Sequence, residues 1–334
     1  MLLLARLAVA YSARPIPTRA TYLMPPAPPL LSITPRQRRW LAMAQAVVLG
    51  CGLAVLLVWI RRERSLVLWD YWLLAGLLLS QLSMVAFGQR FRSVLRLAGL
   101  QLGLLETLRI LSLAVFYHCF VPLSVGSELT KFLKLRAAAP GHSLGLLTGV
   151  LMLDHAVGCV ALLGVSLSLL VLRAPLGPTL AAQPVLLITA AVVLAGLLVL
   201  VVAHRRGMLR GAPQIALQTL YRSRYQAISG VAWSVVMVSL LAAAVAVGSA
   251  GWHFPIAYPE ILFVLASAGI VQLLPVNVAG VGAGDVAGVG LYLALGLTST
   301  QALALVSLLY GYRLAMAAVG AGWELAATRH ARRP

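Results

Sequence analysis

Long apolar stretches, separated by short basic segments, run through the whole sequence and constrain its fold more than any other feature. A helix that crosses a bilayer needs about 20 mostly apolar residues. Of the 334 residues, 61% are hydrophobic and 10% are charged, whereas about 25% of the residues in a soluble domain are charged. The pattern predicts an all-α, polytopic integral membrane helical bundle. It excludes a soluble globular enzyme, a disordered chain and a nucleic-acid-binding domain, so we expect no nucleic-acid partner.

The lengths of the apolar stretches predict which of them cross the membrane. Residues 261–274 and 286–297 are too short to cross alone, and the segment after Pro122 is short as well. We therefore expect two broken or re-entrant helix segments within the bundle. The stretches long enough to cross are residues 40–60, 71–89, 97–120, 144–172, 184–203, 228–247 and 303–323.

Basic residues set the predicted orientation. Lys and Arg number 26 against 8 Asp and Glu, which gives a formal net charge of +18, and cytoplasmic loops carry an excess of basic residues. One such segment, residues 90–96, begins with Arg90 directly after the stretch at 71–89. We expect both termini on the cytoplasmic side of the cell inner (plasma) membrane, although the arginines at 61–64 contradict this scheme. The predicted units are a flexible N-terminal tail (1–35), a transmembrane domain (36–326) and a basic C-terminal tail (327–334).

Acidic side chains inside the apolar stretches are the strongest candidates for function. A carboxylate in the bilayer costs at least about 2.5 kcal/mol on insertion scales. A local pair with Arg109 explains Glu106, and Glu324 lies at the end of the last stretch. The acids that neither explanation covers are Glu128, Asp154 and Asp285.

An ion pair inside the bundle is the structural alternative for each of these three acids. Arg313, in the last apolar stretch, is one base that could supply such a pair. Beside Asp154 the sequence offers only His155, so its partner would come from another helix, with Lys131 or Arg109 as candidates. Both a functional and a structural role therefore stay open.

The first break in the helical pattern lies just before Glu128. Pro122 and Gly126 interrupt the preceding helix, and a new helix would place Glu128 and Lys131 on one face. A broken helix at membrane depth is tolerated where it lines a cavity or is buried in protein. The alternative is a short cytoplasmic turn before a basic amphipathic helix.

The second break resembles the first. Pro275, Asn277, Gly280 and Gly282 interrupt an apolar stretch just before Asp285. A matched pair of broken helices in two halves of a chain is typical of a transporter site. The match predicts that Glu128 and Asp285 lie near each other at the midplane of the membrane.

Three motifs in this order carry a resemblance to a known family. They are Pro122-x3-Gly126-x-Glu128-x2-Lys131, then Leu153-Asp154-His155-x2-Gly158, then Pro275-x4-Gly280-x-Gly282-x2-Asp285. Over about residues 40 to 325 the chain resembles the flippase-like membrane domain, which includes the transmembrane region of lysylphosphatidylglycerol synthases. The resemblance implies a helical bundle with re-entrant segments that moves a lipid between leaflets. The family's lipids include aminoacylated phosphatidylglycerol, and polyprenyl-linked lipids are suspected for relatives.

Two arginines of the family pattern are replaced in this sequence. His155 stands where an Asp-Arg pair has its arginine, and Gly284 stands where an Arg-Glu pair has its arginine. Ser127 likewise replaces a glycine of the usual Gly-Gly-Asp, while all three acids are kept. The two replaced arginines argue against recognition of a lipid phosphate in the way that the resemblance implies. They predict that the acids are available for a cationic or hydroxylated head group.

The predicted function is that of a lipid flippase or lipid transporter, with membrane lipids as partners. No cofactor or metal is expected, because the histidines are dispersed and no nucleotide-binding loop is present. We also expect that the chain does not make lysyl-lipid itself. The predicted substrate-binding residues are Pro122, Gly126, Glu128, Lys131, Asp154, Pro275, Asn277, Gly280, Gly282 and Asp285.

Two alternatives belong to other classes of protein. Gly282-Ala283-Gly284-Asp285 spells the GxGD pattern of intramembrane aspartyl proteases, in which Asp154 would supply the second carboxylate. The other alternative is a membrane scaffold that transports nothing and binds a lipid-modifying or glycosyl-transferring enzyme. An enzymatic role is the less favoured of these functions.

Overall fold

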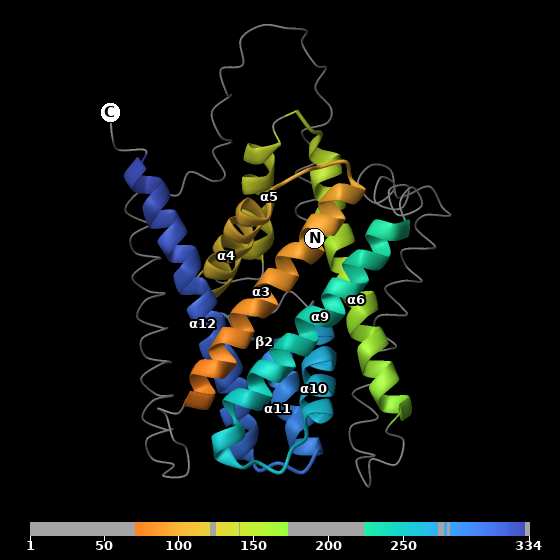
Figure 1. Cartoon of the computed structure of the whole chain (residues 1–334), viewed down its shortest axis with the longest axis vertical. Coiled ribbons are helices and arrows are strands. Elements are labelled where there is room, and N and C mark those ends of the chain that lie inside the picture. Colours follow the sequence, from red (N-terminus) through yellow and green to blue (C-terminus); the bar gives the residue numbers. More distant parts are fainter. Residues whose placement is uncertain are drawn as a thin grey trace, which may run out of the picture.

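The computed structural model describes residues 71–120, 125–139, 141–172, 224–272, 277–278 and 281–330 of the chain (Figure 1). The predicted N-terminal tail and the predicted spans at 40–60 and 184–203 lie outside the described residues. Among the predicted site residues, the same holds for Pro122, Pro275 and Gly280.

The described residues confirm an all-α polytopic membrane bundle. Four helices, which contain residues 71–97, 144–171, 224–252 and 299–323, are long and apolar enough to cross a membrane. The chain is therefore a multi-pass membrane protein. In chain order the elements are α3 (Tyr71–Leu97), α4 (Leu104–Phe120), α5 (Val125–Ala138), α6 (Leu144–Leu172), α9 (Arg224–Gly248), the 3₁₀ turn η3 (Ala250–Trp252), α10 (Tyr258–Val271), β1 (Asn277–Val278), β2 (Val281–Gly282), α11 (Ala283–Ala294) and α12 (Ser299–His330).

Helix α3 continues beyond the end that the sequence predicted for it. The predicted span stopped at residue 89 because Arg90 was assigned to a cytoplasmic basic segment, but the helix runs to Leu97. Arg90 is 8% exposed and lies inside the bundle. The helix therefore extends into the predicted basic segment, and Arg90 is accommodated within the bundle because its charge has a partner.

Two pairs of short helices form hairpins within the bundle. Helix α4 packs against α5, and α10 packs against α11. With 14 residues in α10 and 12 in α11, each is about 20 Å long and shorter than the roughly 30 Å hydrocarbon layer. Figure 1 shows α4 and α5 in the upper half of the molecule and α10 and α11 in the lower half, with β2 between them. The prediction of two short helices near the C-terminal end is confirmed.

A short antiparallel pair of strands follows α10 and leads into α11. Asn277 pairs with Gly282, and Val278 pairs with Val281. The antiparallel pairing reverses the chain direction between the two short helices. It therefore places the first turn of α11 beside the last turn of α10.

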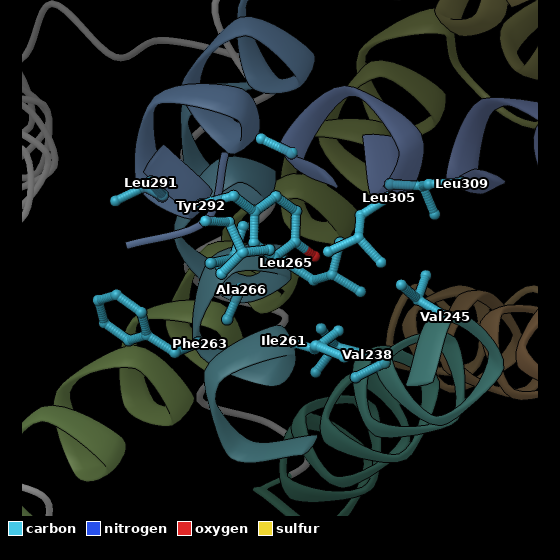
Figure 2. Close-up of a cluster of buried hydrophobic side chains, with 14 residues drawn as sticks. Val238, Val245, Ile261, Phe263, Leu265, Ala266, Leu291, Tyr292, Leu305 and Leu309 are labelled. Carbon is cyan, nitrogen blue, oxygen red and sulfur yellow. The ribbon is translucent and has the colours of Figure 1, made fainter. Parts of the chain in front are cut away.

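Each hairpin has its own apolar cluster that holds it in the bundle. The cluster around the α10–α11 hairpin joins it to α9 and α12 through Val245, Ile261, Leu291 and Leu305 (Figure 2). The cluster around the α4–α5 hairpin joins it to α3 and α6 and includes Phe91, Leu111, Leu135, Leu147 and Leu153. The long helices are shared between the two hairpins, since α12 also packs against α4 and α6 also packs against α10.

Candidate functional site

An ion pair between α3 and α6 forms the most deeply buried part of the candidate site. The Nε and Nη2 atoms of Arg90 donate to Oδ1 of Asp154 at 2.9 and 2.7 Å. The Asp154 side chain is 1% exposed and that of Arg90 is 10% exposed. Because an isolated charge at this depth would be costly, the two side chains stabilise each other's charged forms.

Helix α5 adds a second pair of charges to the first. Lys131 donates from Nζ to Oε1 of Glu128, one turn earlier in α5, at 2.6 Å. The same Nζ lies 3.8 Å from Oδ2 of Asp154. From α6, Nε2 of His155 lies 3.7 Å from Oε1 of Glu128. We call the side chains of Arg90, Glu128, Lys131, Asp154 and His155 the α5–α6 group.

Two neighbours shape this group without adding charge. The Phe87 ring, one turn before Arg90 in α3, lies 4.7 Å from the Arg90 guanidinium carbon and 5.9 Å from Nζ of Lys131. A cation above an aromatic face is attracted by the ring's electron density. A Cβ added at Gly158 would lie 3.1 Å from Nη1 of Arg90, so the glycine leaves room for the guanidinium.

A second ion pair joins α11 to α12. Arg313 donates from Nη1 to Oδ1 and Oδ2 of Asp285 at 2.8 and 3.1 Å, and its Nη2 lies 3.4 Å from Oε1 of Gln272. Oδ2 of Asp285 also accepts the backbone N–H of Gly282 at 2.8 Å, so this carboxylate caps α11. We call the side chains of Gln272, Asp285 and Arg313 the α11–α12 group.

The two groups share a neighbourhood at the C-terminal end of α4. The ring of His118 lies within electrostatic range of Glu128 and Lys131 and also of Asp285 and Arg313. Charges from both hairpins therefore act on one side chain. That Glu128 and Asp285 lie at the midplane of the membrane stays a prediction.

Comparison with known proteins assigns the chain to a family. A family model described as the lysylphosphatidylglycerol synthase transmembrane region matches residues 43–320. The chain belongs to this family. A search of curated proteins and a search of solved structures each found no match.

Guanidinium groups from two other helices lie beside two of the acids in the sequence motifs. Arg90 in α3 neutralises Asp154, and Arg313 in α12 neutralises Asp285. At position 284, a Cβ would lie 2.7 Å from the Ala268 carbonyl oxygen, so an arginine does not fit there. Each of the three acids is in an ion pair within the bundle, and contact of any of them with a head group stays a prediction.

The predicted site residues fall into three sets. Glu128, Lys131 and Asp154 lie in the α5–α6 group, and Asp285 lies in the α11–α12 group with Gly282 as its backbone donor. Gly126 has a structural contact, since its carbonyl oxygen accepts the Thr130 hydroxyl at 2.7 Å. Asn277 is described through its backbone pairing alone. Lipid binding by any of these residues stays a prediction.

Sequence reasoning missed Arg90 and Gln272 and named Arg313 only as a structural base. Arg90 lies 64 residues before Asp154, and no motif links the two positions. The sequence signal for such a base was Asp154 itself, because a carboxylate within a membrane requires a positively charged partner, which here comes from another helix. The predicted local partner of Glu106 was also wrong, since the guanidinium of Arg109 instead lies over the Trp323 ring, 5.9 Å from its centroid.

The arrangement of the acids does not support an aspartyl protease. Two carboxylates that share a proton must lie side by side. Here Asp154 binds Arg90 and Asp285 binds Arg313, so each carboxylate is neutralised by its own guanidinium. The GxGD pattern at 282–285 instead provides the N-terminal cap of α11.

Proposed function

We propose that this chain moves a phospholipid or glycolipid between the two leaflets of a membrane. The observation that carries the proposal is the pair of short helical hairpins, each of which brings an ion-paired carboxylate into an apolar bundle. Broken helices with polar side chains are the usual way in which membrane transporters bind a charged substrate. Membrane lipids are the proposed partners.

Accessibility separates the side chains that would contact a head group from those that support them. The side chains of Glu128, His155 and Arg313 are 21%, 38% and 18% exposed. Asp154 and Lys131 are 1% and 7% exposed and lie behind them. We therefore assign head-group contacts to Glu128, His155 and Arg313.

The ends of the bundle support an orientation for this transporter. Arg96 at the end of α3, Arg136 at the end of α5 and Arg224 at the start of α9 lie at the upper end in Figure 1. Because basic residues are retained in the cytoplasm, we propose that this end is cytoplasmic. The α4–α5 hairpin then enters from the cytoplasm and the α10–α11 hairpin from the other side.

Reconstitution of the full chain into liposomes tests the function. A fluorescent phosphatidylglycerol in the inner leaflet becomes accessible to an external quencher only after it has crossed the bilayer. We expect the wild-type protein to increase the crossing rate above that of protein-free liposomes. Equal rates in the two preparations, with the protein folded and inserted, would refute the proposal.

Matched variants connect this rate to the site. Arg313→Gln removes a charged donor, and hydrogen bonds to charged groups contribute about 1.5–3 kcal/mol, so the rate should fall by at least about tenfold. Glu106→Gln is the control, because this acid lies in the exposed first turn of α4, outside both groups. We expect the control to retain the wild-type rate.

A further inference from the structure

We propose that Glu128 and His155 together bind a proton and that Lys131 then moves from Glu128 to Asp154. The inference rests on the proposed function and adds its regulation: proton uptake gives the α5–α6 group a net positive charge that favours an anionic head group. Three observations carry the inference.

The first observation is a buried carboxylate oxygen that accepts no hydrogen bond from the described residues. Oδ1 of Asp154 accepts hydrogen bonds from both Arg90 donors, whereas Oδ2 is fully buried and has no hydrogen-bond partner in the described part of the chain. Nζ of Lys131 lies 3.8 Å away, so a movement of about 1 Å would bring it to hydrogen-bonding distance. An unpaired polar atom at this depth is costly, which gives Lys131 a second favourable position.

The second observation is the orientation of the His155 ring. Its Nδ1 lies 2.9 Å from the carbonyl oxygen of Leu151. A carbonyl can only accept, so Nδ1 carries the hydrogen and Nε2 of the neutral ring presents its lone pair. That lone pair lies 3.7 Å from Oε1 of Glu128. Two acceptors that lie this close are stabilised when a proton is placed between them.

The third observation is the balance of charge in the α5–α6 group. With His155 neutral, Arg90 and Lys131 balance Asp154 and Glu128. When Glu128 and His155 share an added proton, Glu128 no longer needs Lys131. The Lys131 ammonium then binds Oδ2 of Asp154, and no buried charge is left without a partner. The group gains one positive charge.

The charged and titratable groups around Glu128 come from every helix packed near it. They are Lys131 on its own helix α5, Asp154 and His155 on α6, Arg90 on α3 and His118 on α4. Glu128 is the exchangeable acid among them because it is 21% exposed, whereas Asp154 is 1% exposed and held by an arginine that does not lose its proton.

Position 155 offers two substitutions with opposite outcomes. His155→Arg places a permanent positive charge beside Glu128, so the Lys131 ammonium should bind Asp154 at every pH. Asparagine at position 155 cannot carry the proton, so in His155→Asn the Lys131 ammonium should remain bound to Glu128. The 38% exposure of the His155 side chain leaves space for either residue.

The transport assay is run from about pH 5 to 8, the range in which histidine changes its charge. With fluorescent phosphatidylglycerol, the wild-type rate should rise by about tenfold as the pH falls. His155→Arg should keep the fast rate and His155→Asn the slow rate across this range. His142→Arg, in the exposed α5–α6 loop, should keep the wild-type profile. Identical profiles for wild type and the two position-155 variants would overturn the inference.

Crystal structures of the two variants test the movement without reference to transport. In His155→Arg we expect Nζ of Lys131 within hydrogen-bonding distance of Oδ2 of Asp154, and in His155→Asn we expect it on Glu128. The same Lys131 position in both variants would overturn the inference. A wild-type protein that moves no lipid refutes the proposed function, whereas a transporter with a flat pH profile and a fixed Lys131 refutes only this inference.

Discussion

The burial of the ion pair between Arg90 and Asp154 predicts how much stability is lost when one partner is removed. Asp154→Leu leaves the Arg90 guanidinium, whose side chain is 10% exposed, without its anion. Removing one partner of a buried pair costs about 3–5 kcal/mol because the other charge stays buried. A loss of 3 kcal/mol changes the folding equilibrium constant by more than about a hundredfold.

The reverse substitution is expected to cost less. Arg90→Met leaves Asp154 with Lys131, which already lies 3.8 Å from its free oxygen and can move closer. The double variant Arg90→Met/Asp154→Leu removes both charges and leaves the pair between Lys131 and Glu128 in place. Replacing a buried pair by apolar residues is often neutral, so the double variant should be more stable than Asp154→Leu alone.

The wild type, the two single variants and the double variant form a double-mutant cycle. The free energies of unfolding of these four proteins, measured by denaturant titration in mixed micelles, give the coupling energy between Arg90 and Asp154. We expect a coupling of about 3 kcal/mol, near the upper end for residues in contact. Arg92→Met is the matched control, because this neighbouring arginine is half-buried and bonds Gln89 and a loop carbonyl. Additive costs for Arg90 and Asp154, or a control that costs as much as Asp154→Leu, would refute the argument.

Three further predictions concern the stability of the bundle. Gly320→Ala should lower the free energy of unfolding by about 1–3 kcal/mol, because its Cβ would clash with the Ser112 carbonyl of α4, whereas Gly322→Ala on the same helix meets no atom and should be neutral or stabilising. Asp285→Asn removes the ion pair but keeps an oxygen for the Gly282 N–H, so Asp285→Ala should be less stable than Asp285→Asn by about 1 kcal/mol in the same titration. Tyr292→Phe should leave the melting temperature unchanged or raise it, because the buried hydroxyl finds no partner among the described residues; a clear drop would contradict this reasoning.

The sequence was sufficient to predict the class of fold and the short helices. Apolar length decides whether a helix can cross the bilayer, and this is a local property, so α10 and α11 could be recognised from their lengths. The end of α3 could not be predicted in this way. The burial of Arg90 within this helix depends on Asp154, which lies on another helix, whereas hydropathy considers one segment at a time.

The candidate site could be predicted from its acids but not from its bases. A buried carboxylate shows that a partner exists without showing where it lies. The alternative that assigned Asp154 and Asp285 to ion pairs within the bundle is confirmed, and Arg313 was named among the candidate bases. The position of Glu128, Asp154 and Asp285 within apolar stretches identified the acids, whereas the pairing of Arg90 required the packing of α3 on α6.

The replaced arginines have different physical consequences at the two positions. At position 284 a side chain would clash with α10, and the positive charge beside Asp285 comes from Arg313 in α12, which also binds Gln272. At position 155 the charge beside Asp154 is likewise kept, by Arg90, but a titratable imidazole now faces Glu128. The first arrangement has a permanent charge, whereas the second is the basis of the pH dependence that we propose for the α5–α6 group. Because of this difference, substitutions of His155 are expected to alter regulation, whereas substitutions of Arg90 and Asp285 are expected to alter stability.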